Sequence, residues 1–404
     1  MDVECTLVDF DLSADQLALA DAAASLLDKY ASMTRIRARV GPGVVVGTLP
    51  GAGSTNADKT SSSVGDIAEG FDEELWAAMA EQGWLAVERP ESDGGLAMGM
   101  VEVAVLCEAL GSRLAPAPFA GTILAIDALR GDGDHAPGDQ LDEWTQSLVS
   151  GERIGSVFVD LARSSRLRVE RREAQTTLNG TVGPALFAPS AGILVIVHDG
   201  EVFAVERDPS PDGSHRIKSS AEPIMDRTRE LGWIELDAAR AVVVAGREGA
   251  ERIVNRAATL ASAEMLGCAN AALSMAVQYA KDRVQFGRPI GSFQAIKHKL
   301  ADSLVDVEGM RSSAYYAAWC ASVDDAESSL AASIAKAWCS DASRRVMANA
   351  LQVHGGIGFT WEHDMHLFLK RAQLDQVSYG DADWHRDRLA GILRSRVETT
   401  GNVI

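Results

Sequence analysis

The chain has 404 residues, 47% of them hydrophobic, which is enough for a large core and too long for one simple domain. It carries 38 Lys and Arg against 57 Asp and Glu, a formal net charge of −19 at pH 7. Such a field repels phosphate backbones and anionic lipid headgroups, so it argues against nucleic-acid or membrane binding as the main function. We therefore expect two or three domains that share an interface.

Cysteine usage and the N-terminus indicate a cytoplasmic protein without a metal centre. The start MDVECTLVDF lacks the cationic region and apolar run of a signal peptide, and no stretch approaches the roughly 18–20 apolar residues of a membrane span. No HExxH motif, zinc-type spacing or EF-hand loop is found, so we predict no metal. The cysteines form no CxxC pair, and we expect buried thiols. They are Cys5, Cys107, Cys268, Cys320 and Cys339.

Residues 1–150 are predicted to form an α-helical domain. Ser13 precedes an amphipathic pattern over 12–40 and can cap it. Residues 41–66 are rich in Gly, Ser and Thr and almost uncharged, which predicts a flexible exposed loop. The GTLPGAGST within this loop lacks the spacing and the lysine of a phosphate-binding loop. Helical patterns resume in three segments, 71–84, 99–114 and 119–131.

Residues 151–245 are predicted to form an antiparallel β-domain, because short β-branched runs are broken there by Asn-Gly, Asp-Gly and Pro. The string HDGE at 198–201 predicts a tight hairpin.

Residues 246–404 are predicted to form a helical bundle. Long helical patterns cover 247–283, 293–322 and 325–354, with Ser292 as a possible cap of the second and Gly355–Gly356 ending the third. An apolar stripe along the second helix implies that the helices pack together antiparallel. Its members are Leu300, Leu304, Val307 and Met310. The overall class is therefore α+β and multidomain.

Two strings, RVQFGRPIGSFQAIKHKLAD at 283–302 and QVHGGIGF at 352–359, resemble the acyl-CoA dehydrogenases. The string MDRTRELGWIELDAARAVVV at 225–244 is similar to the last strands before the bundle in that family. The resemblance covers essentially the whole chain except 41–66. It implies an N-terminal α-helical domain, a middle antiparallel β-domain and a C-terminal four-helix bundle.

The resemblance also implies an activity, an FAD cofactor and partners. These enzymes form a trans-2 double bond in an acyl-CoA thioester, with a glutamate removing the α-proton and the flavin accepting a hydride from the β-carbon. The expected electron acceptor is an electron-transfer flavoprotein. The family forms dimers or tetramers in which the bundle of one subunit completes the FAD site of its neighbour.

Matching positions assign the cofactor contacts expected from the resemblance. Arg283 should bind the FAD pyrophosphate across the interface, since a guanidinium fork suits two adjacent phosphates. Gln285 and Phe286 should contact the same cofactor. Gln352 and the backbone of Gly355–Gly356 should approach its adenosine end. The alternative is that Arg283 only ends a helix and the glycines only turn the chain.

The catalytic glutamate of the family is missing from both of its usual positions. The common position falls on Tyr379, and a tyrosine of ordinary pKa near 10 is a poor base at neutral pH. The minority position falls on Ala257, one residue from Arg256. Glu264, about two turns further on, is a candidate relocated base, because a buried carboxylate can have a raised pKa. It could equally be a structural glutamate between helices.

Three aspartates near Tyr379, namely Asp375, Asp381 and Asp383, are weaker candidate bases. The residues alone allow a second interpretation of this stretch, LDQVSYGDADWHR. Gly380 can end one helix and Asp381 can cap the next, with Asp383 in its first turn.

The β-domain departs from the family as well. The Thr-Glu-Pro-x-x-Gly-Ser-Asp-like loop expected after the first strand is replaced by VFVDLARSSRLRVE. The Trp followed by Ser or Thr that lies beside the flavin ring is missing from LNGTVGPALFAPSAG. The half-site that the chain offers to a neighbour is therefore kept, and the half that holds its own flavin ring is degraded.

This asymmetry resembles the heteromeric (α2β2) acyl-CoA dehydrogenases of actinobacterial steroid and lipid catabolism. The sequence suggests the base-lacking subunit of such an enzyme, with FAD shared at an interface with a paralogous subunit. The substrate would be an acyl-CoA, such as a steroid side-chain or lipid CoA ester. Two alternatives stay open: a self-sufficient homomeric enzyme that uses Glu264, and a flavin-free structural or acyl-CoA-binding partner.

Overall fold

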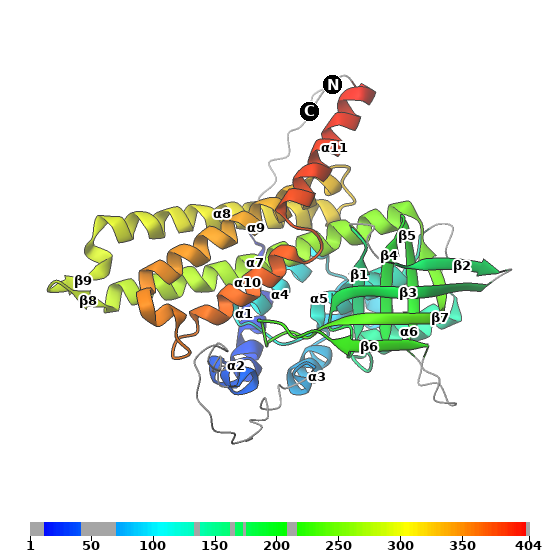
Figure 1. Cartoon of the computed structure of the whole chain (residues 1–404), viewed down its shortest axis with the longest axis horizontal. Helices are drawn as coiled ribbons and strands as arrows, with labels where there is room; N and C mark the ends of the chain where they lie inside the picture. Colours follow the sequence, from blue (N-terminus) through cyan, green and yellow to red (C-terminus); the bar gives the residue numbers. More distant parts are fainter. Residues whose placement is uncertain are drawn as a thin grey trace, which may run out of the picture.

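The computed structural model describes residues 12–41, 70–132, 138–161, 166–172, 175–207 and 216–400. The chain runs from N-terminal helices through a β-domain into long C-terminal helices, in the predicted order (Figure 1). Apart from Gly41, the predicted flexible loop lies outside the described residues, and so does Cys5.

The N-terminal helices form as their capping signals indicate. They are α1 (Ala14–Tyr30), α2 (Met33–Val40), α3 (Glu73–Glu81), α4 (Met100–Ser112), α5 (Phe119–Leu129) and α6 (Asp139–Val149), with short 3-10 turns η1 (Trp84–Ala86) and η2 (Glu91–Asp93). Ser13 caps α1 in a capping box with Gln16, as predicted. The single helical pattern over 12–40 is two helices, because Ser32 takes an extended conformation and starts α2.

A seven-stranded sheet forms the β-domain. The strands are β1 (Gly155–Val159), β2 (Arg168–Arg172), β3 (Gln175–Leu186), β4 (Ile193–His198), β5 (Glu201–Glu206), β6 (Ile217–Ala221) and β7 (Leu231–Ala245). Their order is β1-β4-β5-β7-β3-β2, with β6 also paired to β7. Asp199 and Gly200, both with positive φ, form the predicted tight turn between β4 and β5.

The expectation of a purely antiparallel sheet is wrong at one place, because β1 pairs with β4 in parallel. The chain leaves β1, passes through β2 and β3 on the far side of the sheet, and returns in β4 beside β1. Turn signals report only strands that are adjacent in sequence, so this pairing has no local signature.

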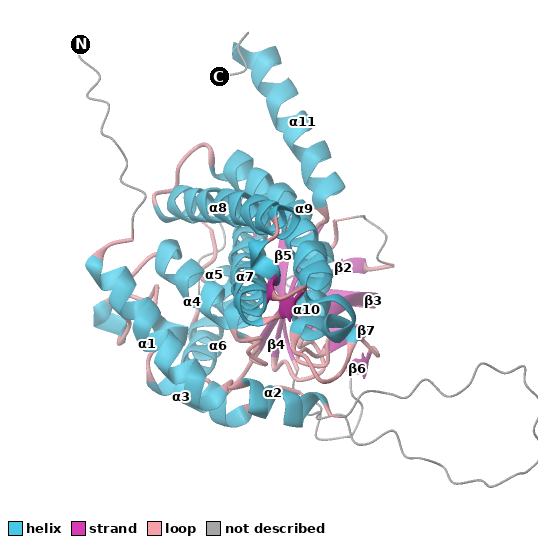
Figure 2. Ribbon diagram, turned by 90° about the vertical axis from the view of Figure 1, so that its left-hand side faces the viewer, coloured by secondary structure: helices cyan, strands magenta, loops and turns pink. Residues whose placement is uncertain are grey.

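The C-terminal part is built around one long helix, α7 (Arg247–Asp282). It is surrounded by α8 (Gln294–Ser322), α9 (Ser328–His354), α10 (Met365–Val377) and the N-terminal helix α4 (Figure 2). The last helix, α11 (Ala382–Thr400), extends away from the body (Figures 1 and 2). Short elements β8 (Val284–Gln285), β9 (Arg288–Pro289), η3 (Ile290–Ser292) and η4 (Gly355–Phe359) connect the helices.

Helices α4 and α7 cross with their backbones in contact. A Cβ at Gly111 would lie 2.1 Å from the Glu264 carbonyl oxygen, and one at Gly267 would lie 1.9 Å from that of Glu108. Glycine at both positions is what permits this approach. Within the described residues α7 is also the one helix long and apolar enough to cross a membrane, but 72% of its most apolar window is buried, as in a core helix.

Two expectations for α8 are wrong. Ser292 does not cap the helix: its hydroxyl donates to the Pro289 carbonyl oxygen at 2.7 Å, and the N-cap position is Phe293. The apolar stripe is only partly a core stripe, since Val307 and Met310 are buried while Leu304 is 51% exposed. Periodicity identifies an apolar face but does not tell how wide a strip of that face its neighbours cover.

A buried group of charges joins the three parts of the chain. Arg371 on α10 has no exposed surface. Its Nε donates to Asp226 Oδ2 at 2.6 Å and its Nη1 to Glu264 Oε1 at 2.7 Å, and Nη2 reaches the Thr228 hydroxyl. Asp226 and Thr228 precede β7 in the β-domain, and Glu264 lies on α7. One side chain therefore links the β-domain to two helices of the bundle.

Arg229 extends the same network to the N-terminal helices. Its Nη2 binds Glu264 Oε1, and its Nη1 donates to the carbonyl oxygens of Ala115 and Ala117, between α4 and α5, at 2.9 and 3.2 Å. Because two arginines share the Glu264 carboxylate, its charge is compensated within the protein interior.

We expect Arg371→Met to destabilise the protein strongly. The substitution keeps apolar volume but leaves Asp226 and Glu264 without their main partner, and breaking a buried ion pair costs about 3–5 kcal/mol. The control is Arg345→Met, because Arg345 pairs with Asp306 at 2.6 Å from a 47% exposed side chain, where about 1 kcal/mol or less is expected. Urea unfolding of both variants measures the difference. Equal losses of unfolding free energy in the two variants would contradict the prediction.

Asp375→Asn is expected to change the pH dependence of stability. Burial raises the pKa of Asp375 to about 6 from its ordinary 3.8, so between these values the folded protein binds the proton more tightly than the unfolded chain. Ionisation of this group therefore lowers the free energy of unfolding as the pH rises through that window, by on the order of 1–3 kcal/mol. Urea unfolding from pH 4 to 7 should show the asparagine variant gaining stability relative to wild type. A difference in the free energy of unfolding that stays constant over this pH range would contradict the prediction.

Candidate functional site

The two family-like strings lie together at one end of the bundle. Arg283 follows α7 directly, and the next residues form the β8–β9 hairpin. Gly355, with φ 64°, ends α9. The ring of Tyr279, one turn before Arg283, lies 4.7 Å from that of His354, next to Gly355. This contact brings together two segments that are about seventy residues apart in the sequence.

Three polar side chains of these strings are exposed and have no hydrogen-bond or ion-pair partner within the described part of the chain. Arg283, Gln285 and Gln352 are exposed, and none of their side chains makes an intramolecular hydrogen bond or ion pair there. A Cβ built at Gly355 or Gly356 meets nothing within 4 Å. A free guanidinium, two free amides and two open glycines are groups that can bind an anionic nucleotide cofactor.

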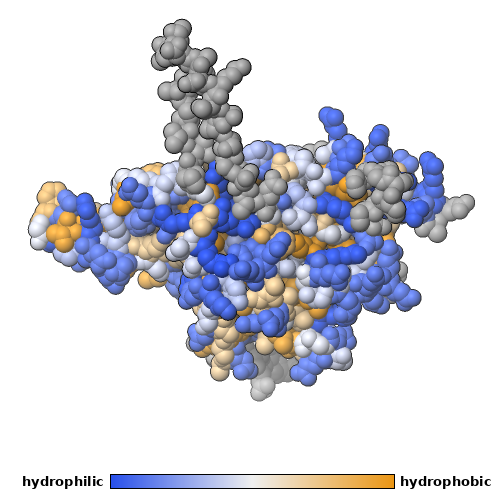
Figure 3. Space-filling model, turned by 90° about the horizontal axis from the view of Figure 1, so that it is seen from below, coloured by the Kyte–Doolittle hydropathy of each residue, from blue (hydrophilic) through white to orange (hydrophobic). Residues whose placement is uncertain are grey.

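The hairpin also exposes large apolar side chains. Phe286 sits at its tip with φ 54° and is 91% exposed, while Val284 is 54% exposed. Phe286 meets the ring of Phe293 edge to face, and Arg288 lies over Phe293 at 4.1 Å. Figure 3 shows hydrophobic surface at the end of the long axis where β8 and β9 lie in Figure 1. The left-handed backbone is a strained conformation for a bulky residue, and in it the Phe286 ring is exposed to solvent.

A separate cavity of about 340 Å³ lies between the β-domain and the end of α10. Its walls come from three places where the sequence departs from the family. These are the end of β1 and the loop after it (Val157–Val159, Leu161), the stretch after Asn-Gly (Gly183–Leu186) and the turn at the usual base position (Val377–Gly380), together with Leu231 and Leu374. The lining contains no carboxylate, no other charged side chain and no tryptophan. Residues 162–165 of the loop after β1 lie outside the described residues.

Tyr379 occupies the edge of this cavity and does not have the properties of a base. Burial raises the pKa of its phenol to about 12, so it stays protonated at neutral pH. Its backbone is left-handed, with φ 57°, and Gly380 follows with φ 99°. The residue is therefore part of a turn, as the second interpretation of this stretch predicted.

The neighbouring aspartates are explained by that turn. Asp381 Oδ1 accepts a hydrogen bond from the Trp384 backbone N–H at 2.8 Å, which is the predicted cap of α11. Asp383 lies in the first turn of α11 and pairs with Arg386 at 2.8 Å. Asp375 is buried on α10 and does not line the cavity.

Glu264 is held in a structural role. Arg229 and Arg371 both bind its Oε1, so this oxygen is occupied by ion pairs inside the protein. It does not line the cavity beside Tyr379. The minority base position is equally unavailable, since Ala257 is fully buried and Arg256 forms ion pairs with Glu88 and Asp127.

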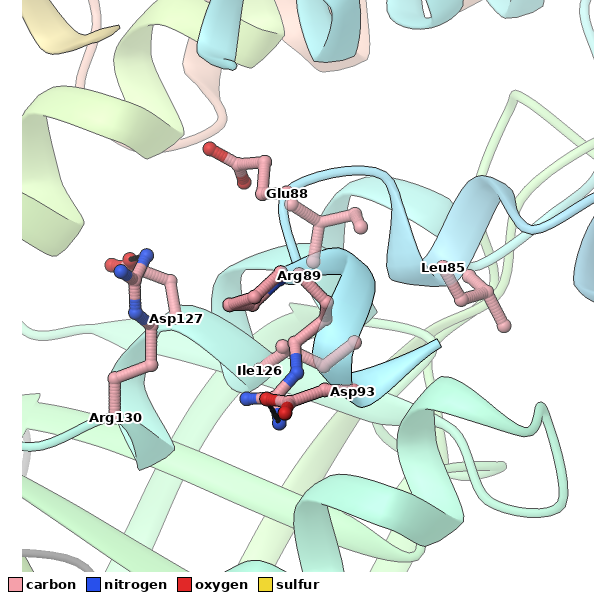
Figure 4. Close-up of a pocket in the computed structure, with 9 residues that line it drawn as sticks. Leu85, Glu88, Arg89, Asp93, Ile126, Asp127 and Arg130 are labelled. Carbon is pink, nitrogen blue, oxygen red and sulfur yellow. Dashed lines mark hydrogen bonds and ion pairs between the residues drawn. The ribbon is translucent and has the colours of Figure 1, made fainter. Parts of the chain in front are cut away.

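The ion pairs of Arg256 belong to a network that the sequence patterns did not indicate. Figure 4 shows a cavity of about 140 Å³ whose charged residues face one another, with Arg89 against Asp93 and Arg130 beside Asp127. The Arg89–Asp93 distance is 2.8 Å and the Arg130–Asp127 distance is 3.6 Å. A larger polar cleft of about 1040 Å³ adjoins it. Because these charges already compensate one another, we assign the network to the junction between α5 and α7.

Comparisons with known proteins agree with the resemblance. The model of the acyl-CoA dehydrogenase N-terminal domain matches residues 60–152, and that of the C-terminal domain matches residues 245–393. The acyl-CoA dehydrogenase IpdE2 of Mycolicibacterium smegmatis is 34% identical over 307 residues, which are 75% of this chain and 82% of that protein. IpdE2 of Mycobacterium tuberculosis is 32% identical over 306 residues, 75% and 81% of the two chains.

Solved structures show the same fold over nearly the whole chain. A variant of the Tcur3481–Tcur3483 steroid ACAD has a TM-score of 0.79 at 26% identity, covering 95% of this chain and 99% of that one. The ChsE4–ChsE5 complex of Mycobacterium tuberculosis has a TM-score of 0.77 at 26% identity, covering 96% and 99%. The chain therefore belongs to the acyl-CoA dehydrogenase family, flavin-dependent oxidoreductases that act on the CH–CH bond of acyl-CoA thioesters.

Proposed function

We propose that this chain is the base-lacking subunit of a heteromeric acyl-CoA dehydrogenase and completes the FAD site of a paralogous partner. The observation that carries the proposal is the contrast between its two half-sites. Arg283, Gln285 and Gln352 are exposed at the end of the bundle, have no partner among the described residues and can bind a cofactor held by another chain. The cavity where the chain would hold its own flavin ring has neither a carboxylate nor a charged group.

In this proposal Arg283 binds the pyrophosphate, Gln285 and Phe286 contact the cofactor beside it, and Gln352 with Gly355–Gly356 approaches the adenosine. Bound FAD supplies the hydride acceptor of the reaction. This chain's residues bind and orient the cofactor, and the partner supplies the base. The exposed Phe286 and Val284 would be buried on assembly, which accounts for large apolar side chains at the tip of a hairpin.

Similar proteins support the choice of partner and substrate class. Two of the similar structures are complexes of two named chains, Tcur3481–Tcur3483 and ChsE4–ChsE5, and the first is described as a steroid ACAD. We infer a paralogous partner and a steroid or lipid acyl-CoA substrate, with an electron-transfer flavoprotein as acceptor and the cytoplasm as location. The homomeric alternative loses its candidate base, since both arginines bind Glu264.

The first test is the flavin spectrum of the chain expressed alone and with its paralogous partner. We expect colourless protein alone and a yellow complex that acyl-CoA bleaches. Arg283→Ala should lower FAD retention by the complex at least tenfold, since a charge-assisted contact to phosphate contributes roughly 1.5–3 kcal/mol. Arg344→Ala, which removes an exposed arginine of α9 outside the two strings, is the control and should retain FAD.

The possible outcomes separate the three functions. Yellow protein alone that acyl-CoA bleaches would establish the self-sufficient enzyme and refute the proposal. A stable but colourless complex would indicate the flavin-free structural partner.

A second test removes the hydroxyl at the usual base position. Tyr379→Phe in the complex should leave kcat within about twofold of wild type, because a phenol with a pKa of about 12 contributes no general-base catalysis at neutral pH. Steady-state turnover of acyl-CoA measures this. A loss of a hundredfold or more, with the complex still yellow, would show that Tyr379 takes part in proton transfer.

A further inference from the structure

The turn at the edge of the 340 Å³ cavity is held by an unusual buried lysine. Tyr379 and Gly380 both have left-handed backbones, and Tyr379 has a bulky side chain that disfavours this region. A strained residue persists only where its surroundings enforce the conformation.

Lys336 on α9 supplies the main contacts. Its side chain is fully buried, and Nζ donates to the carbonyl oxygens of Gln376 at 2.9 Å and Gly380 at 2.7 Å, with the Ser340 hydroxyl at 3.4 Å. An ammonium group has three hydrogens to donate, and each has an acceptor here. Burying an ammonium is costly, so a lysine that donates two hydrogen bonds to the carbonyl oxygens at this turn points to a specific role for the turn.

His385 on α11 binds the carbonyl that Lys336 does not reach. Its Nε2 lies 3.1 Å from the Tyr379 carbonyl oxygen, so this nitrogen carries the proton. The side-chain amide of Gln376 donates in return to the Ser340 carbonyl oxygen of α9 at 2.5 Å. The end of α10, the turn and the start of α11 are thus tied to α9 by side chains on both sides.

We propose that Lys336 is a positioning residue, which fixes residue 379 at the edge of the cavity by holding the carbonyl oxygens on either side of it. The backbone conformation at the usual base position is then kept, although the residue there is Tyr379 and not glutamate. This role does not depend on whether FAD is shared between subunits, because it concerns only the geometry of the turn.

The charged and titratable groups around Lys336 change protonation at pH values different from that of Lys336 itself. Burial lowers the pKa of Lys336 to about 8. Cys339 on α9 has its pKa raised to about 12, that of Asp375 on α10 is raised to about 6, and that of His385 on α11 is lowered to about 3, burial being the main cause each time. The carboxylate of Asp381 in the turn acts on Lys336 in the opposite direction to burial and raises its pKa. Between pH 7 and 9, Lys336 is therefore the group of this cluster that titrates.

The test is hydrogen–deuterium exchange of the full chain, followed peptide by peptide. In Lys336→Met, the segment from Gln376 to His385 should lose protection about tenfold or more, since hydrogen bonds from a charged donor to two carbonyls are lost. Lys299→Met is the control, because the Lys299 ammonium lies on α8 and reaches only Asn349, at 3.4 Å. Protection elsewhere in the bundle should stay within about threefold of wild type.

A uniform loss of protection through the bundle would show a general packing role and overturn the proposal, and so would an unchanged turn segment. If Lys336→Met does not fold, Lys336→Gln decides, measured at pH 7, below the pKa of about 8 at which Lys336 loses its charge. The glutamine amide is neutral and has two N–H donors in place of three, so protection from Gln376 to His385 should fall while the rest of the bundle stays within about threefold of wild type. A uniform loss, or an unchanged turn segment, would refute the positioning role.

Discussion

The buried guanidinium of Arg371 is the interaction on which the arrangement of the three parts depends. It binds Asp226 of the β-domain and Glu264 of the bundle. Arg229 binds the same Glu264 carboxylate and also donates to the carbonyl oxygens after α4. Charges without access to water must be compensated locally, so these contacts specify one relative placement of helices and sheet. The close crossing of α4 and α7 at Gly111 and Gly267 lies beside the network and depends on the same placement.

This constraint also bears on the chemistry of the chain. Glu264 Oε1 binds both Arg229 and Arg371, so this carboxylate takes part in the contacts between the β-domain and the helices. Polar groups that could serve a cofactor are found instead at the far end of the bundle, where Arg283 and Gln352 face solvent. The buried ion pairs of the interior thus contrast with an exposed, partly apolar end of the bundle.

Expectations from the sequence held where the determinant is local. Ser13 and Asp381 cap helices as predicted, since a cap needs only a side chain and an amide three residues away. The Asp199-Gly200 turn forms because both residues tolerate positive φ. Predictions failed where distant segments decide: the parallel pairing of β1 with β4 and the exposure of Leu304 each depend on neighbours that the local pattern does not specify.

The sequence by itself determined the family and the order of the three parts, because spaced motifs record which chemical groups are present. Only the tertiary structure decided what these groups can do. It brought the three degraded segments around one cavity, paired Glu264 with two arginines and placed Lys336 under the turn at Tyr379. The physical reason is that burial and pairing set the protonation and availability of a side chain, and both are properties of residues distant in sequence.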